Sequence, residues 1–175
     1  MKIKICGITD PDMAFFAAEA GADFIGIICY PPSKRYVAPD LAKEIAAAAI
    51  KGGAEPVAVF VDGEREEIEE LGIPTLQLYG KIPVLRDTYR YLYANHPDIS
   101  LREGDYVLID YSRGFDGDIP QDKPYFLAGG LTAENVSSAI KKLKPYGVDV
   151  CSGVEVNGVK DRKKITTFIE QVRAL

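Results

Sequence analysis

DFIGIIC, at residues 23–29, is the stretch that decides the fold. After its first residue it is almost continuously apolar, whereas a strand with one face in water alternates apolar and polar residues. A continuous run of this kind is typical of a strand that is buried on both faces, as in a parallel sheet covered by helices. The segments on either side are therefore expected to alternate strand with helix.

This alternation extends outward to both ends of the chain. Apolar runs predict strands at residues 2–6, 23–29, 56–61, 75–79, 105–110, 125–128 and 147–151. Helices are predicted at residues 12–20, 39–51, 64–71, 136–143 and 165–172. A further strand is predicted at residues 82–86, followed by a helix at 88–95. Eight strands alternating with helices predict a parallel α/β fold, a (β/α)8 TIM barrel, built as one domain over residues 1–175.

The chain is short for such a barrel, because 175 residues fall below the ~200 that the fold usually needs. The fourth and fifth predicted strands almost touch in sequence, and residues 111–124 leave room for one helical turn at most. Helices are therefore expected to be reduced or missing after strands four and six. Bare strands would expose an apolar surface, which suggests that a second copy of the chain covers the gap as a homodimer.

Composition and charge narrow the class of protein. The formal net charge is −5, so nothing favours nucleic acid or an anionic membrane as a partner. No apolar run approaches the ~18 residues of a membrane span, and the charged start of the chain does not resemble a signal peptide. Three cysteines without close spacing argue against a disulfide framework. We therefore expect a protein of the reducing cytoplasm.

Residues at the carboxyl ends of the predicted strands are the candidates for chemistry, because barrel enzymes carry their sites there. Cys6 and Asp110 each end a predicted strand. A free cysteine is often only a small buried hydrophobe, and an aspartate there can simply fix a loop. A thiol at the barrel mouth can also act as a base, and a carboxylate ending an apolar strand is costly unless it is used or paired.

Two glycine turns and one arginine suggest an anionic ligand. Gly129 and Gly130 follow the seventh strand, while Ser152 and Gly153 follow the eighth. Glycine lets backbone N–H groups approach a phosphate, although a glycine pair often only makes a tight turn. Barrels often bind phosphate after these two strands. Arg35, in the loop after the second strand, carries a planar fork that suits a carboxylate.

These residues lie within motifs that resemble one family. The chain is similar to phosphoribosylanthranilate isomerases in KICGIT at residues 4–9, GADFIG at 21–26, YPPSKRY at 30–36, VAVFV at 57–61, LQLYG at 76–80, LID at 108–110, AGGLTAENV at 128–136 and VDVCSGVE at 148–155. The motifs run in family order and cover about three-quarters of the chain.

The resemblance implies a reaction and a role for each site residue. It implies an Amadori rearrangement of phosphoribosylanthranilate, a step of tryptophan biosynthesis, without a metal or organic cofactor. Cys6 is then the general base and Asp110 the general acid, while Arg35 holds the anthranilate carboxylate. The expected substrate contacts are Gly7, Arg35, Gln77, Tyr79, Gly129, Gly130, Asp149, Ser152 and Gly153, with the phosphate held at residues 129–130 and 152–153.

The chain departs from the family pattern at three places. Tyr79 stands where the family usually has histidine, and Cys151 where it usually has serine. The loop after strand six reads YSRGFD at residues 111–116 instead of the family's longer motif, which ends in a tryptophan that this chain lacks. The loop helps to close the family's site, so its change bears on rate and affinity more than on the type of reaction.

Three alternatives remain open at this point. A related phosphate-binding barrel can act on another sugar phosphate, although the histidine-pathway enzymes usually pair two aspartates. A non-catalytic barrel can keep phosphate affinity without turnover. Finally, the thiols of Cys6, Cys29 and Cys151 lie near the ends of strands one, two and eight, where three thiolates can bind zinc.

Overall fold

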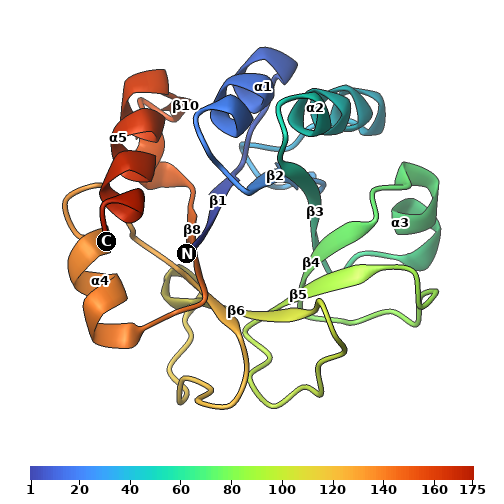
Figure 1. Ribbon diagram of the computed structural model, residues 1–175. Helices are drawn as coiled ribbons and strands as arrows, with labels where there is room; N and C mark the ends of the chain where they lie inside the picture. Colours follow the sequence, from blue (N-terminus) through green and yellow to red (C-terminus); the bar gives the residue numbers. More distant parts are fainter.

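A computed structural model describes residues 1–175 and shows a closed barrel of eight parallel strands (Figure 1). The strands pair in chain order, and the barrel closes where β1 pairs with β8. They are β1 (Lys2–Cys6), β2 (Phe24–Ile28), β3 (Glu55–Val61), β4 (Thr75–Tyr79), β5 (Arg90–Ala94), β6 (Tyr106–Asp110), β7 (Tyr125–Ala128) and β8 (Gly147–Val150). The predicted TIM barrel is confirmed.

Each strand has two buried faces. Inward-pointing side chains fill the barrel interior, where Phe24, Tyr106 and Phe126 meet edge to face. Outward-pointing residues such as Ile25 and Ile27 belong to the larger core between the strands and the outer layer. A strand with both faces apolar loses the period-two signal, which explains the continuous run at residues 23–29.

Five α-helices form an incomplete outer ring: α1 (Pro11–Glu19), α2 (Pro39–Lys51), α3 (Arg65–Leu71), α4 (Val136–Leu143) and α5 (Arg162–Arg173). Aspartates cap two of them, since the side chain of Asp10 accepts from the N–H of Met13 and that of Asp161 from the N–H of Lys164. A hairpin of β9 (Glu155–Val156) and β10 (Val159–Lys160) precedes α5. None of the helices has the length and the apolar sequence that a membrane span requires.

One side of the ring has no α-helix (Figure 1). Loops join β4 to β5 and β5 to β6, and only the short 3-10 helix η1 (Tyr111–Arg113) follows β6. Missing helices after strands four and six were expected. The helix predicted at residues 88–95 is wrong, because this segment holds β5, and the strand predicted at 82–86 is a loop. Pro83 lies in that loop and lacks the N–H that a central strand must pair.

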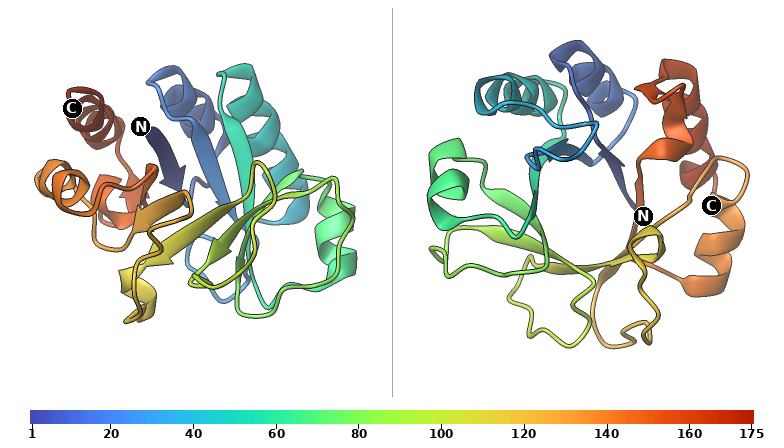
Figure 2. Two further views of the ribbon diagram at one scale, coloured as in Figure 1. Left: turned by 60° about the horizontal axis from the view of Figure 1, so that its bottom comes forward. Right: turned by 180° about the vertical axis from the view of Figure 1, so that it is seen from behind.

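The loops cover the strands in place of helices. Tyr91 and Tyr93 point outward from β5, yet both are buried. Each of the three connections sends apolar side chains onto the core; these include Ile82, Leu85, Tyr89, Ile99, Leu101, Phe115 and Ile119. The expected bare apolar surface is therefore absent, and the two views of Figure 2 show these connections lying along the strands. Homodimer formation, if it occurs, needs another reason.

Polar side chains hold the same loops together. The carboxylate of Asp105, itself buried, accepts hydrogen bonds from the N–H of Tyr91 at 2.9 Å and from Nε of Arg102 at 3.2 Å. Arg102 also donates to the carbonyl of Tyr89 at 2.7 Å and lies over the Tyr91 ring. Nζ of Lys123 donates to two loop carbonyls at 2.9 Å each. Side chains thus satisfy backbone groups that a helix would satisfy internally.

Candidate active site

The carboxyl ends of the barrel strands surround a cavity of about 180 Å³. Successive residues of a strand point to opposite faces, so every second residue of a barrel strand points inward. This periodicity brings five of the predicted site residues to the cavity, and the adjoining loops bring two more, Arg35 and Ser152; the five are Cys6, Gln77, Tyr79, Asp110 and Asp149. The structure thus gathers at one mouth of the barrel residues that lie up to 146 positions apart in the sequence. Figure 2 shows the barrel from two further sides.

On one side of the cavity a thiol lies among buried charges. Cys6 ends β1, and Lys4, two positions earlier on the same face, is fully buried. Nζ of Lys4 donates to Oδ1 of Asp149 at 3.0 Å. Burial opposes the charge of Lys4, yet Asp149 and Cys6 together raise its pKa. Burial also raises the pKa of Asp149, to about 7, against the attraction of Lys4.

A second thiol lies directly beside the first. Cys151 follows β8, and its side chain is in hydrogen-bonding contact with that of Cys6. Nζ of Lys160 lies 3.6 Å from its Sγ. The hydrogen bond from Cys6, helped by Lys160 and Arg35, lowers the pKa of Cys151 to about 6. The same bond, together with burial, raises the pKa of Cys6 well above its ordinary value.

The opposite side of the cavity holds a carboxylate fixed by donors. Oδ2 of Asp110 accepts from the Tyr79 hydroxyl at 2.7 Å. Oδ1 accepts from the N–H and the hydroxyl of Ser112 at 2.9 and 2.6 Å. The backbone N–H of Asp110 donates to Oδ1 of Asn95 at 2.8 Å. Burial beside this carboxylate raises the pKa of Tyr79, which keeps the phenol protonated and donating.

Arg35 reaches the cavity from the loop after β2, but one edge of its guanidinium is already engaged. Nε and Nη2 both donate at 2.7 Å to the carboxylate of Glu155. Glu155 is buried and also accepts from Nζ of Lys160. Burial opposes the charge of Glu155, yet Arg35 and Lys160 lower its pKa to about 2. The cations on both sides hold Glu155 ionised, and Glu155 in turn fixes the plane of the Arg35 fork.

The predicted phosphate contacts lie in part at a neighbouring surface cavity. Gly130, Ser152 and Gly153 line it together with Lys163 and Lys164. A Cβ on Gly153 would lie 1.9 Å from the Leu131 carbonyl oxygen, so the two turns touch only because this residue is glycine. Ser152 starts the 3-10 helix η2 (Ser152–Val154), and helix N-termini favour anions.

Two of the predicted glycines have other neighbours. Gly129 takes a positive φ of 98° and packs against the backbone of Tyr111 and Ser112, beside Asp110. Gly7, also at positive φ, lies against Arg35 and Cys151. A side chain at either position would push into the groups that line the main cavity. These two glycines therefore make room for site residues.

Gln77 holds a buried polar atom without a partner. Its Oε1 is the single buried side-chain oxygen or nitrogen that lacks a hydrogen bond within the protein. An unpaired buried acceptor carries a cost of about 1–3 kcal/mol. Because Gln77 lines the cavity, a ligand with a hydroxyl or N–H donor can remove this cost.

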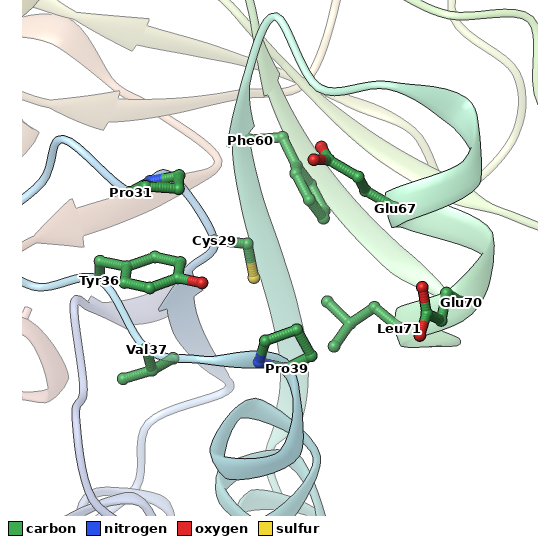
Figure 3. Close-up of a pocket in the computed structure, with 9 residues that line it drawn as sticks. All are labelled: Cys29, Pro31, Tyr36, Val37, Pro39, Phe60, Glu67, Glu70 and Leu71. Carbon is green, nitrogen blue, oxygen red and sulfur yellow. The ribbon is translucent and has the colours of Figure 1, made fainter.

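Cys29 lies apart from the other two thiols. It lines a separate cavity of about 270 Å³ between the β2 loop and α3, with Phe60 and Leu71 (Figure 3). Figure 3 shows its sulfur pointing into that cavity, and burial raises its pKa to about 12. No group of three or more Cys, His, Asp or Glu side chains in the structure is arranged to hold a metal ion. The zinc alternative therefore has no geometric support.

Several cavity neighbours were not among the predicted site residues. Lys4 could have been found, because a lysine inside an apolar strand, two positions before Cys6, must share its inward face. Asn95, Glu155 and Lys160 gave no such signal, since each reaches the site from a turn or hairpin whose path depends on the folded chain. Ser112 belongs to the loop after strand six, which was expected to help close the site, but Ser112 itself was given no role.

The fold and this site define a class: a (β/α)8-barrel enzyme with acid–base groups at the carboxyl ends of its strands. Comparisons with known proteins narrow this class to one family. Residues 105–171 match the family model for N-(5'-phosphoribosyl)anthranilate (PRA) isomerase. The enzyme of that name from Chlamydia felis is 38% identical over the whole of this chain and 98% of its own length.

Solved structures agree with the family match. Monomers of the dimeric phosphoribosylanthranilate isomerase from Thermotoga maritima share 31% identity, with a TM-score of 0.77 over all of both chains. A phosphoribosylanthranilate isomerase in complex with reduced 1-(o-carboxyphenylamino)-1-deoxyribulose 5-phosphate shares 30% identity, also at a TM-score of 0.77 over all of both chains. The chain belongs to the phosphoribosylanthranilate isomerase family.

Proposed function

We propose that this chain isomerises N-(5'-phosphoribosyl)anthranilate to the 1-deoxyribulose 5-phosphate product in tryptophan biosynthesis, with Cys6 as general base and Asp110 as general acid. The family membership supports the reaction. One observation supports the residues: a thiol on β1 and a carboxylate on β6, from different sides of the barrel, line one cavity. This membership also argues against the histidine-pathway alternative.

The first step opens the sugar ring. Asp110 donates a proton to the furanose ring oxygen, and the C1' bond to that oxygen breaks to give a Schiff base with the anthranilate nitrogen. Asp110 must accept a proton again before the next turnover. The hydroxyl of Ser112 and that of Tyr79 hold one carboxylate oxygen each, which fixes the direction in which the proton travels.

The second step removes the proton from C2'. Cys6 does this as a thiolate, which requires that Cys6 first passes its proton to the neighbouring Cys151 thiolate. Lys4, fully buried beside Cys6, stabilises the thiolate form. The enolamine that results then becomes the ketone. A base and an acid of this kind each contribute about 10²–10⁴-fold to rate.

Substrate binding uses the groups around these two residues. Glu155 holds Nε and Nη2 of Arg35, which leaves Nη1 to donate to the carboxylate of the substrate. Gln77 offers its unpaired Oε1 to a sugar hydroxyl or to the anthranilate N–H. The backbone at Gly130 and at residues 152–153, with the Lys163 and Lys164 side chains nearby, receives the phosphate. The cavity wall includes Tyr79 and Asp149, and the lining groups next to it have room because Gly7 and Gly129 carry no side chain.

The test is turnover of freshly generated phosphoribosylanthranilate, followed by the loss of its fluorescence. Cys6→Ser and Asp110→Asn are each expected to reduce kcat by about 10²–10⁴-fold. Cys29→Ser and Asp62→Asn are matched controls. Cys29 lines another cavity, and Asp62, the residue after β3, accepts from the N–H of Lys81 and does not line the main cavity, so both variants should keep near-normal kcat. A wild-type protein that binds a product analogue without turnover would establish the non-catalytic alternative. Failure to bind the product analogue would contradict phosphoribosylanthranilate as the substrate.

Assembly is a separate matter. The Thermotoga maritima relative is described as dimeric, and on that relationship we propose a homodimer for this chain as well. The covered outer face of β5 and β6 is not the reason for it. Light scattering at micromolar concentration tests the proposal, and a monomer would contradict it.

A further inference from the structure

The two thiols at the barrel mouth occupy opposing positions on neighbouring strands. Residues of β1 and β8 pair in register, with Lys4 opposite Asp149 and Ile5 opposite Val150. The next pair in this register is Cys6 and Cys151, and the alternation that turns Lys4 and Asp149 inward turns both thiols inward too. Neighbouring strands lie ~4.8 Å apart, which falls within the Cα separation of ~4.4–6.8 Å that a disulfide spans.

Positive charges surround this pair on both sides. Nζ of Lys160 lies 3.6 Å from Sγ of Cys151, and Arg35 packs against the same sulfur over Gly7. Lys4 lies beside Cys6. Two carboxylates, Asp149 and Glu155, are each bound to these cations. Cations next to a thiol favour the thiolate, which is the nucleophile in thiol–disulfide exchange.

A neighbouring thiol and nearby cations, more than access, separate this pair from the third thiol. Cys151 is partly exposed and lines the open cavity, so a small oxidant can reach it. Cys29 lies in another cavity, without a thiol neighbour and with its pKa raised by burial. Reactive cysteines combine a stabilised thiolate with exposure and a second thiol in reach. In this chain Cys151 meets all three conditions, and the buried Cys6 is the second thiol within its reach.

We propose that Cys6 and Cys151 are a site of reversible oxidation, at which a small disulfide converts the two thiols into an intramolecular disulfide. The Cys151 thiolate attacks one sulfur of the small disulfide, whose other half leaves as a thiolate. Cys6, after loss of its proton, attacks the sulfur of Cys151, and the second half leaves. The two protein sulfurs are oxidised, and the small disulfide is reduced to two thiols, one of which takes up the Cys6 proton and the other a proton from solvent.

The consequence for activity rests on the proposed function, whereas the disulfide itself does not. A linked Cys6 cannot accept a proton from C2', so the oxidised protein would be inactive. Serine, usual in the family at the position of Cys151, cannot form this bond. The cysteine at position 151 thus makes the activity of the protein sensitive to thiol oxidation.

The experiment is treatment of the full chain with glutathione disulfide, alkylation of the remaining thiols, and mass spectrometry of the intact protein and its peptides. Wild type and Cys29→Ser should lose two free thiols without retaining glutathione and should yield a linked peptide pair containing Cys6 and Cys151. Cys151→Ser should yield no linked pair. Three free thiols, or a stable glutathione adduct in wild type, would overturn the proposal.

Turnover before and after the same treatment separates the two proposals. Activity should fall in proportion to the linked fraction and return with dithiothreitol, in wild type and in Cys29→Ser alike. A disulfide that forms while turnover persists would leave the oxidation site standing and would contradict Cys6 as the base. The count of free thiols decides the oxidation site even if the protein shows no turnover.

Discussion

The barrel has two arcs that are built differently. α-Helices cover the arc that runs from β7 through β8 and β1 to β3, whereas loops cover the arc from β4 to β6. Each arc supplies one candidate catalytic group, Cys6 from the helical arc and Asp110 from the loop arc. The strands are equally buried in both. A barrel strand therefore needs apolar cover and satisfied backbone groups, and a helix is one of two ways to provide them.

The largest expected effect breaks the loop arc. Asp105→Ala removes the acceptor for the buried N–H of Tyr91 and for two N–H groups of Arg102. Leaving these donors unpaired should cost about 3 kcal/mol of unfolding free energy. Asp161→Ala, which removes a cap from α5 in the helical arc, should cost only about 1 kcal/mol. Urea unfolding measures both, and equal costs would contradict the dependence of the loop arc on its polar side chains.

The second prediction concerns the charged groups of the helical arc, in which Arg35 and Lys160 both bind Glu155. Glu155→Gln should lose about 2 kcal/mol near neutral pH, because two charged hydrogen-bond partners lose their anion. The pKa of Glu155 is lowered from 4.5 to about 2, so its contribution is present above pH 4.5 and disappears as the pH falls towards 2. Unfolding free energies of wild type and variant should therefore converge in that window. A gap that stays constant down to pH 2 would contradict an ionic role.

The third effect compares how the arcs fix their catalytic groups. Tyr79→Phe removes one hydrogen bond to Asp110 and leaves Ser112 in place, which should cost about 1 kcal/mol. This corresponds to a fall in kcat of about fivefold with KM little changed, if the phenol only positions the acid. Steady-state kinetics provide the measurement. A rise in KM alone would instead make Tyr79 a substrate contact.

The smallest effect concerns the border between the arcs. Glu69 on α3 accepts from Nε of Arg65 at 3.0 Å and lies 3.8 Å from Nε of Arg86 in the loop after β4. Both arginines are largely exposed. Glu69→Gln should therefore change the unfolding free energy by less than about 0.5 kcal/mol. A larger loss, measured in the same urea series, would show that the arcs are joined by charge as well as by packing.

Predictability from sequence also differed between the arcs. In the helical arc, apolar spacing and capping residues predicted β1, α2 and β7 to the residue. In the loop arc, the segment 88–95 was assigned to a helix. Its true strand, RYLYA at Arg90–Ala94, has tyrosines on one face and apolar residues on the other, so it shows no alternation. Aromatic residues favour strands, and Pro83 argued against the rival segment.

The site residues follow a similar division. Inward positions at strand ends could be listed from the sequence, because strand periodicity alone puts Gln77 and Tyr79 on one face. The pairing of Asp149 with Lys4 depends on the register between β1 and β8, which local sequence does not encode. The partners from turns could not be listed. Glu155 binds Arg35 across 120 positions of sequence, and nothing local in either segment encodes that contact.

Pairing between β1 and β8 joins residues about 145 positions apart, the most distant strand contact in the chain. Contacts of such high sequence separation carry a large loop-closure entropy and are slow to form. Lys4 and Cys6 stand on one side of this seam, and Asp149 and Cys151 on the other. The charged surroundings of Cys6 therefore form only when β1 pairs with β8, and we expect the absorbance of a thiolate in this pair to report that pairing during folding.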